Sequence, residues 1–385
     1  MELSFKRLSI EGACGAHFID GNSVSLLYKG RDSFDAIFNA IDDAREIICL
    51  QFYIFRNDET GTEVANRLKK KAAEGVRVYL LYDHFGSIGT PLNFWKDLRA
   101  SGINVRASRP FKWGDPFYYA HRDHRKLIII DGLKAFTGGL NIANEYRGFH
   151  IKIKRTGWRD TGIMLEVHIA LELSKTFVKT WTAWGGGQIK DSNGSIISSE
   201  GSGGLPVIPI FASSSKGRRM MRKLLYYSIK QAQKSILLTT AYFTPSRRLV
   251  DSLEDAIRKG VSVKLLLPGI SDVPAAHYAG RAFFKRLLRS GVKIYNYQGE
   301  VLHAKSYVFD SCWSIVGSAN LDFQSLRWND EGNVGILSHE FGSQMTSVFE
   351  EDLQHSIEIT AQDWENRPLC DRIKERFFVL FRRRL

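Results

Sequence analysis

Apolar runs and amphipathic segments alternate along this chain, and the alternation occurs twice. Residues 76–83 and 261–267 are short, β-branched and apolar, which is typical of buried strands. Residues 62–74 and 249–259 place apolar side chains on one face at helical spacing, and each is followed by a strand-like run after a glycine, as in left-handed helix caps. Strands that alternate with helices predict an α/β fold in which helices cover the faces of a sheet.

The two series of elements match block for block, which indicates an internal repeat. Five polar or glycine positions recur at one fixed offset of 179 residues. They are His124 and His303, Lys126 and Lys305, Asp131 and Asp310, Gly138 and Gly317, and Asn141 and Asn320. We therefore predict two similar domains, each a mixed β-sheet flanked by helices, packed face to face about a pseudo-twofold axis.

Changes in composition suggest where the domains begin and end. The first domain is expected at residues 1–184 and the second at 205–370. Residues 185–204 between them are rich in glycine and serine and are predicted to be a linker or loop. The last segment, 371–385, combines aromatic and basic residues and is treated as a separate tail.

Composition narrows the function without fixing it. The chain has 385 residues, 44% of them hydrophobic, and a net charge of +13, which favours anionic partners such as nucleic acid, acidic lipid or phosphorylated substrates. The four cysteines have no C-x-x-C spacing, so we expect a reducing compartment and no zinc site. No window of the sequence approaches the ~20 apolar residues of a membrane span. A soluble or surface-bound protein is expected.

Each repeat carries the pattern H-x-K at the start of a strand-like run, which puts the imidazole and the ammonium group on the same face. A single histidine on an apolar strand is more often structural, but two copies with the same following residues favour catalysis. If the pseudo-twofold axis joins the motifs, two imidazoles, two ammonium groups and two carboxamides surround one cavity.

That set of groups suits attack on a phosphodiester, with one histidine as nucleophile and the other as general acid. We expect Lys126, Lys305, Asn141 and Asn320 to donate to the phosphoryl oxygens. Asp131 and Asp310 are the candidates for holding the imidazole tautomers. No metal or cofactor is needed, because the lysines supply the positive charge.

The pattern H-x-K-x4-D followed by G-[GS]-x-N resembles the signature of the phospholipase D superfamily, present here twice. Around it, residues 50–55, 138–146, 158–161, 241–245 and 317–322 resemble bacterial cardiolipin synthases of the short type that lacks N-terminal membrane spans. Two positions depart from the family pattern, Gln324 where the family usually has arginine and Gly162 where histidine is more usual, and both bear on the choice of substrate.

The resemblance implies transfer of a phosphatidyl group from phosphatidylglycerol through a phosphatidyl-histidine, with His124 as nucleophile and His303 as acid by analogy. It adds Gly139, Ser318 and Glu331 to the expected substrate-binding positions. A phospholipase D-type hydrolase, or a nuclease of the same superfamily, stays open as an alternative. We expect an anionic phospholipid as partner, no nucleic acid, and a monomer, since both half-sites lie on one chain.

The tail offers a route to the lipid surface. If helical, residues 371–385 place Phe377, Phe378, Phe381 and Leu385 near one side, with basic residues at the rims. That pattern is typical of a basic interfacial helix, although a helix whose aromatics join the core fits equally well. The expected location is peripheral, on the cytoplasmic side of the cell membrane.

Overall fold

The computed structural model describes residues 5–111, 121–148, 157–189 and 204–383. The predicted linker falls largely outside these ranges, as do the last two residues of the tail. We call the described part up to residue 189 the first half and the part from residue 204 the second half. Within the described residues, no helix is both long enough and apolar enough to cross a membrane.

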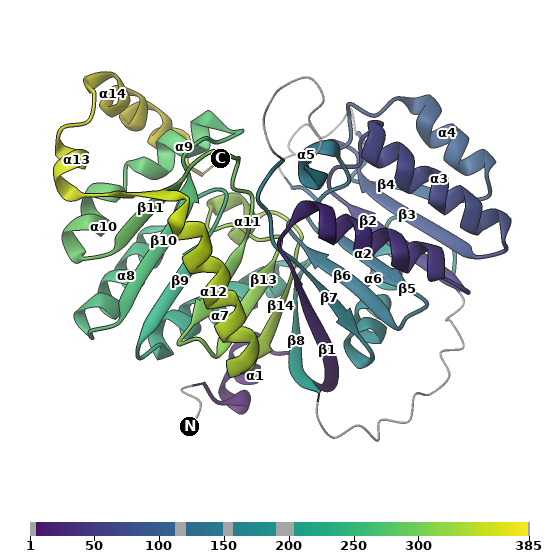
Figure 1. Cartoon of the computed structure of the whole chain (residues 1–385), viewed down its shortest axis with the longest axis horizontal. Coiled ribbons are helices and arrows are strands. Elements are labelled where there is room, and N and C mark those ends of the chain that lie inside the picture. Colours follow the sequence, from purple (N-terminus) through teal and green to yellow (C-terminus); the bar gives the residue numbers. More distant parts are fainter. Residues whose placement is uncertain (1–4, 112–120, 149–156, 190–203, 384–385) are drawn as a thin grey trace.

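The described strands form one 15-stranded sheet, and its order displays the repeat (Figure 1). The first half has the order β4-β3-β2-β5-β6-β7-β1, and the second half has the matching order β11-β10-β9-β12-β13-β14-β8, with β15 added at its edge. In both halves the three strands farthest from the centre of this repeat are parallel and the others antiparallel. The antiparallel pair β1 and β8 joins the halves. The predicted fold class is therefore confirmed.

The strand bounds follow the predicted apolar runs. In the first half they are β1 (Ile19–Leu27), β2 (Ile47–Phe52), β3 (Arg77–Asp83), β4 (Asn104–Ser108), β5 (Leu127–Ile130), β6 (Lys134–Gly138) and β7 (Gly162–Glu166). In the second half they are β8 (Leu205–Ala212), β9 (Ser235–Thr239), β10 (Ser262–Pro268), β11 (Lys293–Tyr297), β12 (Ser306–Phe309), β13 (Trp313–Gly317), β14 (Glu331–Leu337) and β15 (Ser356–Ile359).

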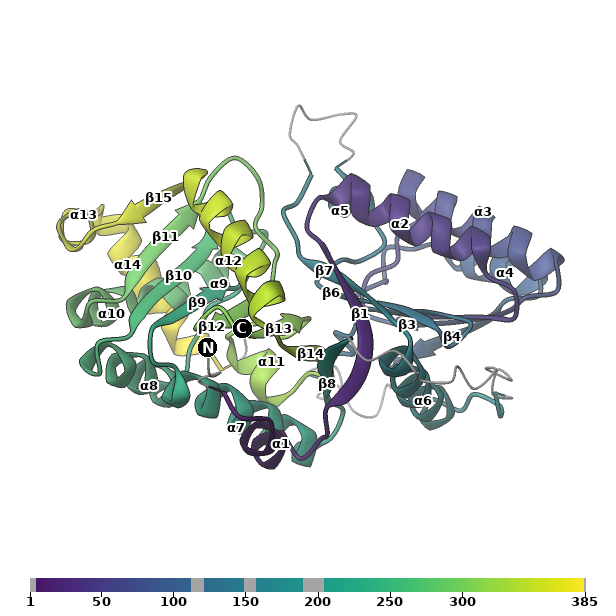
Figure 2. The same ribbon diagram turned by 60° about the horizontal axis from the view of Figure 1, so that its bottom comes forward.

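The helices lie on both faces of the sheet (Figures 1 and 2). Those of the first half are α1 (Arg7–Cys14), α2 (Gly30–Asp43), α3 (Glu59–Ala73), α4 (Leu92–Ala100), α5 (Asn144–Arg147) and α6 (His168–Ala183). Those of the second half are α7 (Ser215–Gln231), α8 (Arg247–Arg258), α9 (Pro274–Arg281), α10 (Phe284–Ser290), α11 (Phe323–Arg327), α12 (His339–Gln354), α13 (Ala361–Glu365) and α14 (Leu369–Phe378), followed by a 3-10 turn, η2 (Val379–Phe381).

Local sequence explains the two predicted helices. Helix α3 begins earlier than its apolar pattern because the Asp58 side chain accepts a hydrogen bond from the Gly61 amide and caps it. Helix α8 is capped in the same way by Ser246. Gly75 and Gly260 follow these helices with φ of 92° and 85°, the left-handed conformation that glycine adopts without strain.

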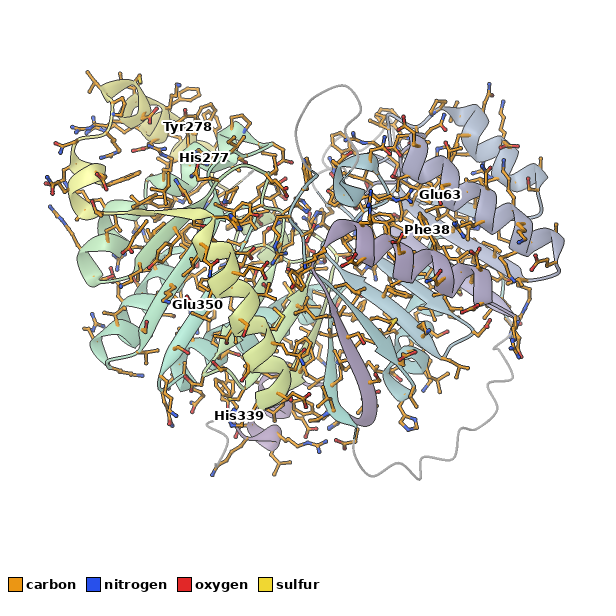
Figure 3. The ribbon with its side chains drawn as sticks, viewed as in Figure 1. Phe38, Glu63, His277, Tyr278, His339 and Glu350 are labelled. Carbon is orange, nitrogen blue, oxygen red and sulfur yellow. The ribbon has the colours of Figure 1, made fainter. Side chains whose placement is uncertain are left out.

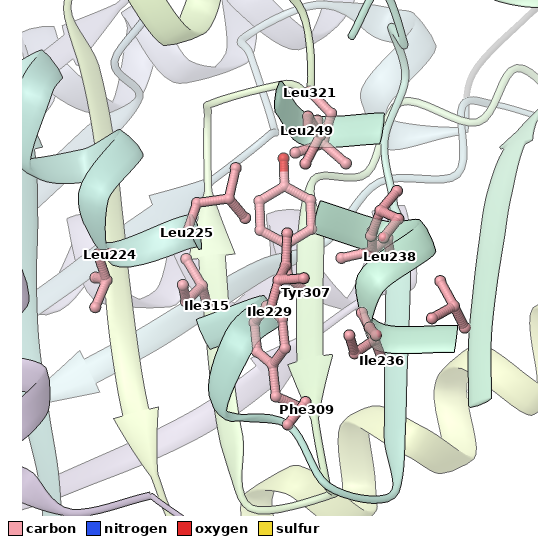
Figure 4. Packing of buried hydrophobic residues seen from close by; sticks show 14 of the residues in the cluster. Leu224, Leu225, Ile229, Ile236, Leu238, Leu249, Tyr307, Phe309, Ile315 and Leu321 are labelled. Carbon is pink, nitrogen blue, oxygen red and sulfur yellow. The ribbon is translucent and has the colours of Figure 1, made fainter. Parts of the chain in front are cut away.

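Three apolar clusters hold these layers together. One packs α2, α3 and α4 on the sheet of the first half, and another packs α7, α8 and α10 on the sheet of the second. Figure 4 shows the second of these, where α7 and α8 side chains surround Tyr307 and Phe309 of β12. The third cluster combines residues of both halves, among them Leu127 and Ile129 of β5 with Val308 and Val316 of β12 and β13. Burial of this shared face fixes one half against the other.

The segment before β1 belongs, by packing, to the second half. Because it precedes the first strand, this segment is expected in the first domain. In the structure, Phe5, Ile10 and Phe18 join the apolar cluster of the second half, and α1 contacts α7. The apolar side chains of this segment pack against the second half, so the order of elements along the chain does not by itself define the boundary between the domains.

Candidate active site

Both H-x-K motifs lie where the halves meet, immediately before β5 and β12. The His124 amide donates to the Asp330 carbonyl at 2.9 Å, and the His303 amide donates to the Arg159 carbonyl at 2.7 Å. Each motif is thus held by backbone of the opposite half. The side chains are almost fully covered, with His124 exposed by 7% and Lys305 by 1%. The fold brings both repeats of the predicted site to one buried junction.

The His124 imidazole is oriented by the second half. Its Nδ1 lies 3.2 Å from the Glu331 Oε2 atom and 3.1 Å from the Ser318 carbonyl. An Nδ1–H that donates to these oxygens leaves the Nε2 lone pair available for the reaction. Burial lowers the pKa of His124, and the positive charge of Lys126 lowers it further. His124 is therefore held neutral, as a nucleophile must be.

The His303 imidazole has the equivalent arrangement with the first half. Its Nδ1 lies 2.7 Å from the Asp160 Oδ2 atom and 2.6 Å from the Lys305 Nζ atom. An Nδ1–H donates to the carboxylate, so Nε2 again faces the reaction. Burial, together with the charge of Lys305, lowers the pKa of His303 to about 4. Asp160 keeps its negative charge, because Lys305 and His303 outweigh the effect of its burial and lower its pKa.

Asp160 is a residue that the sequence analysis did not assign to the site. A signal for it exists in the strand pairing. Gly138 of the first motif pairs with Gly162, and Gly317 of the second pairs with Asn333. The residue two positions before each partner is acidic, Asp160 in one half and Glu331 in the other. The fixed offset of the motifs hides this match, because the loops between motif and acid differ in length.

The glycine turn after each motif supports these carboxylates. A Cβ atom added to Gly139 would lie 2.0 Å from the Asp160 carboxylate, so only glycine leaves room for it. Ser318 takes the equivalent place in the second half, and its hydroxyl donates to Glu331. The amides of both residues donate to neighbouring carbonyls. Gly139 and Ser318 therefore position the acids, whereas the sequence analysis expected contact with the substrate.

The expectation that Asp131 and Asp310 hold the imidazole tautomers is wrong. Asp131 accepts hydrogen bonds of 2.8 Å from the amides of residues 45–47, where β2 begins. Asp310 does the same for residues 233–235 at the start of β9. Each aspartate follows the whole length of a strand and stands seven residues after its histidine. In an extended chain at ~3.3 Å per residue this separates the two by up to roughly 23 Å. These carboxylates anchor the parallel strands.

The two lysines lie beside their own histidines. Lys126 Nζ donates to the His124 carbonyl at 2.6 Å, and Lys305 Nζ donates to the His303 carbonyl. Burial lowers the pKa of Lys126 to about 7 and that of Lys305 to about 8. Each buried motif thus places an ammonium group beside its imidazole, where it can donate hydrogen bonds to the oxygens of a negatively charged ligand.

The two asparagines hold the loops that follow β2 and β9. Asn141 Oδ1 accepts from the Ile54 amide at 3.0 Å, and Asn320 Oδ1 accepts from the Tyr242 amide at 3.2 Å. These loops carry a second pair of residues that sequence reasoning missed. The Tyr53 ring lies 4.9 Å from that of His124, edge to face, and Tyr242 lies 6.2 Å from His303. The aromatic rings form part of the wall around each imidazole.

The buried ammonium group of Lys126 should lower the stability of the fold. Its folded pKa of about 7 lies below the ordinary value of 10.5, so the unfolded chain binds the extra proton between these two pH values. The unfolding free energy should therefore rise with pH across that window. Below the window Lys126 is protonated in both states, and the full loss of stability from burying its charge applies. We expect Lys126→Met to raise the unfolding free energy by roughly 2–4 kcal/mol at pH 6, and by less at pH 9, while abolishing turnover.

Denaturant unfolding at the two pH values measures this effect. Lys96→Met, which removes an exposed lysine of α4, is the control and should leave the pH dependence unchanged. A loss of stability in Lys126→Met at pH 6 would contradict the argument, because it would mean that the buried ammonium group is compensated by its neighbours.

Comparison with known proteins agrees with this geometry. The family model described as "Cardiolipin synthase, PLD-like domain" matches residues 37–150 and 225–353, one segment in each half. Cardiolipin synthase A of Pseudomonas putida is 32% identical over 354 residues, which cover 90% of this chain and 71% of that protein. The major cardiolipin synthase of Bacillus subtilis is 34% identical over 362 residues, 94% of this chain and 75% of the relative.

Among solved structures, the phosphatidylserine synthase of Haemophilus influenzae superposes with a TM-score of 0.76 over 99% of this chain and 100% of that one. The identity is 14%, so this match shows a shared fold.

Two equivalent halves that meet at paired H-x-K motifs define an enzyme of the phospholipase D superfamily. Within that superfamily, the chain belongs to the cardiolipin synthase family, which has the phospholipase D-like domain. The predicted resemblance is thereby confirmed, and with it the class of phosphatidyltransferase.

Proposed function

We propose that this enzyme converts two molecules of phosphatidylglycerol into cardiolipin and glycerol. The observation that carries the proposal is the pair of buried imidazoles. Each has its Nδ1 atom bound to a carboxylate of the opposite half and its Nε2 atom free for chemistry. The names of the relatives support cardiolipin as the product.

In the first step, His124 Nε2 attacks the phosphorus of the donor lipid. The bond from phosphorus to the headgroup glycerol oxygen breaks as His303 gives that oxygen a proton, and a phosphatidyl group remains on His124. Lys126 and Lys305 donate to the phosphoryl oxygens as charge shifts onto them. The arriving phosphate charge raises the proton affinity of His303, which burial and the charge of Lys305 otherwise hold low.

In the second step, the now neutral His303 takes a proton from a primary hydroxyl of a second phosphatidylglycerol. The hydroxyl oxygen attacks phosphorus, the bond from phosphorus to His124 Nε2 breaks, and cardiolipin leaves. The same histidine thus acts as acid and then as base. Because the imidazoles are nearly covered, a lipid alcohol bound at the junction competes well with water, which favours transfer over hydrolysis.

The tail supports work at a bilayer surface. Helix α14 docks on α9 through Arg281, which pairs with Asp371 and Glu375, and through Phe378, whose ring stacks on Tyr278. Figure 3 labels Tyr278 on α9, close to α14. Its other side exposes an apolar stripe of Leu369, Ile373, Phe377 and Leu380, each at least 55% exposed. One face of the tail therefore packs on the protein, and the apolar side chains exposed on the other face support the proposal that it contacts lipid.

We further propose a monomer bound peripherally to the cytoplasmic side of the cell membrane. Both imidazoles and all four site acids and lysines come from one chain, and the free thiols of the four cysteines suit a reducing compartment.

Incubation of the purified protein with phosphatidylglycerol vesicles, followed by mass spectrometry of the lipids, tests the reaction. We expect cardiolipin and free glycerol, and neither with His124→Ala. Phosphatidic acid in place of cardiolipin would show that water is the acceptor and that the enzyme is a hydrolase. Cleavage of nucleic acid without any lipid product would replace the proposal with a nuclease.

A further inference from the structure

A second concave site lies on the second half, outside the buried junction. It has a volume of ≈ 890 Å³ and is walled by α7, the start of α8, α11 and the end of the tail. We call it the basic pocket. Nine of its lining residues are cationic: Arg219, Arg222, Lys223, Lys230, Arg247, Arg248, Arg327, Arg382 and Arg383. Its size suits a phospholipid headgroup.

Within the part of the chain that the structure describes, no acidic side chain neutralises the charge of the basic pocket. No aspartate or glutamate lines it, and among the described residues none of the nine cations forms an ion pair. Arg222 instead donates to the Leu326 carbonyl, and Arg248 lies over the Tyr226 ring at 4.5 Å. Burial and the neighbouring Arg327 lower the pKa of Arg222, which reflects this crowding of like charges. Such a concentration of cations is stabilised by an anion.

Two polar features of the wall point to an oxygen-rich anion. Thr244 is 1% exposed, and its hydroxyl has no hydrogen-bond partner among the described residues. The amino terminus of the twelve-residue helix α8 begins in the same wall, at Arg247, and presents the positive end of its dipole. Phosphate oxygens accept hydrogen bonds from hydroxyls, arginines and helix amides alike.

The surroundings of the basic pocket indicate that this anion belongs to a bilayer. The apolar stripe of the tail ends at Leu380. Two and three residues further along the chain, Arg382 and Arg383 line the pocket. Exposed apolar side chains beside unneutralised arginines match the interface of an anionic membrane, where acyl chains lie next to phosphates. A nucleic acid would leave that stripe in water.

We propose that the basic pocket binds the phosphate groups of anionic phospholipids at the membrane surface while the apolar stripe inserts beside them. This inference rests on the proposed function only in that the enzyme acts at a bilayer. The loops from β9 and β13 carry Tyr242 and Asn320 of the active site and then continue into the pocket at Thr244 and Phe323. Membrane binding at the pocket therefore brings the catalytic junction close to its lipid.

Vesicle flotation of the full chain tests the proposal without relying on turnover. All proteins carry His124→Ala, so that no lipid is converted. The test variant adds Arg219→Gln, Arg247→Gln and Arg327→Gln, three exposed pocket residues. The control adds Arg31→Gln, Lys70→Gln and Lys96→Gln, three exposed cations of the first half that lose the same net charge. Equal thermal midpoints establish that both variants fold.

We expect the pocket variant to lose roughly a hundredfold in partition onto vesicles of phosphatidylglycerol and phosphatidylcholine, and the control to change less than threefold. Binding of the parent should weaken with added salt. Equal losses in both variants would show that only net charge matters, and would overturn the proposal. So would unchanged vesicle binding with a selective loss of affinity for a labelled single-stranded oligonucleotide.

These outcomes are separable from those of the proposed reaction. If phosphatidylglycerol yields no cardiolipin, the proposed function fails, while the flotation result still decides whether the basic pocket binds anionic lipid.

Discussion

His303→Ala is expected to slow turnover of phosphatidylglycerol by ~10²–10⁴-fold, yet to react in a burst with a phosphatidyl donor whose leaving group is an acidic phenol. A phenolate leaves without a proton, so attack by His124 no longer needs a general acid. The second step still needs His303 as base. The phosphatidyl adduct should therefore accumulate on His124 in an amount equal to the enzyme, and intact-protein mass spectrometry should detect it.

The equivalent change on the other histidine separates the two roles. His124→Ala should give neither burst nor adduct with either donor, because the attacking nitrogen is lost. The geometry favours this assignment: Asp160 lies 2.7 Å from His303, whereas Glu331 lies 3.2 Å from His124. A closer carboxylate stabilises the imidazolium that the acid must form. An adduct on His303 in the His124→Ala variant would reverse the roles.

The repeat made most of this fold predictable. His124 and His303 stand at one constant offset, as do the four recurring residues that follow each of them, and the strand order of the two halves matches position for position. The apolar runs that follow both motifs, β5 and β12, belong to the cluster shared by the halves, and so both motifs lie at the junction. Local patterns were enough for the strands and for the caps at Gly75 and Gly260.

The partners of the imidazoles were not predictable from spacing within one motif. Asp131 is near His124 in sequence, but the extended strand β5 carries it to the far end of that strand, where β2 begins. The carboxylate that binds His303 comes from the other half, beyond loops of unequal length. Side chains that meet across a pseudo-twofold axis leave a signal only in the strand register, here at Gly138 and Gly162. Which face of the tail docks likewise depends on contacts with Tyr278 and Arg281 of α9, which the sequence of the tail does not indicate.

Because each imidazole depends on the opposite half, the two half-sites should fail together when either carboxylate is lost. The acid of one half positions the histidine of the other. Backbone hydrogen bonds from the amides of His124 and His303 also join each motif to the segment that carries this acid. A change that shifts one half relative to the other therefore disturbs both steps of the reaction.

Asp160→Asn is the second change from which we expect a large effect, a loss of ~10²–10⁴-fold in kcat with the fold retained. Asparagine keeps the size of the side chain and can still accept from the Thr161 amide. It lacks the negative charge that opposes the effect of burial on His303. The pKa of His303 should therefore fall further. Since the acid must be protonated, the alkaline limb of kcat/KM should move to lower pH.

Asp131→Asn is the matched control, because it changes an aspartate of the same motif that binds backbone amides away from both imidazoles. It should lower the thermal midpoint and leave the pH profile in place. Glu331→Gln should lower kcat like Asp160→Asn, but through the nucleophile. If Asp160→Asn lowered only the thermal midpoint and moved no limb of the profile, Asp160 would be a structural residue and the orientation of His303 would have to come from Lys305 and the surrounding rings.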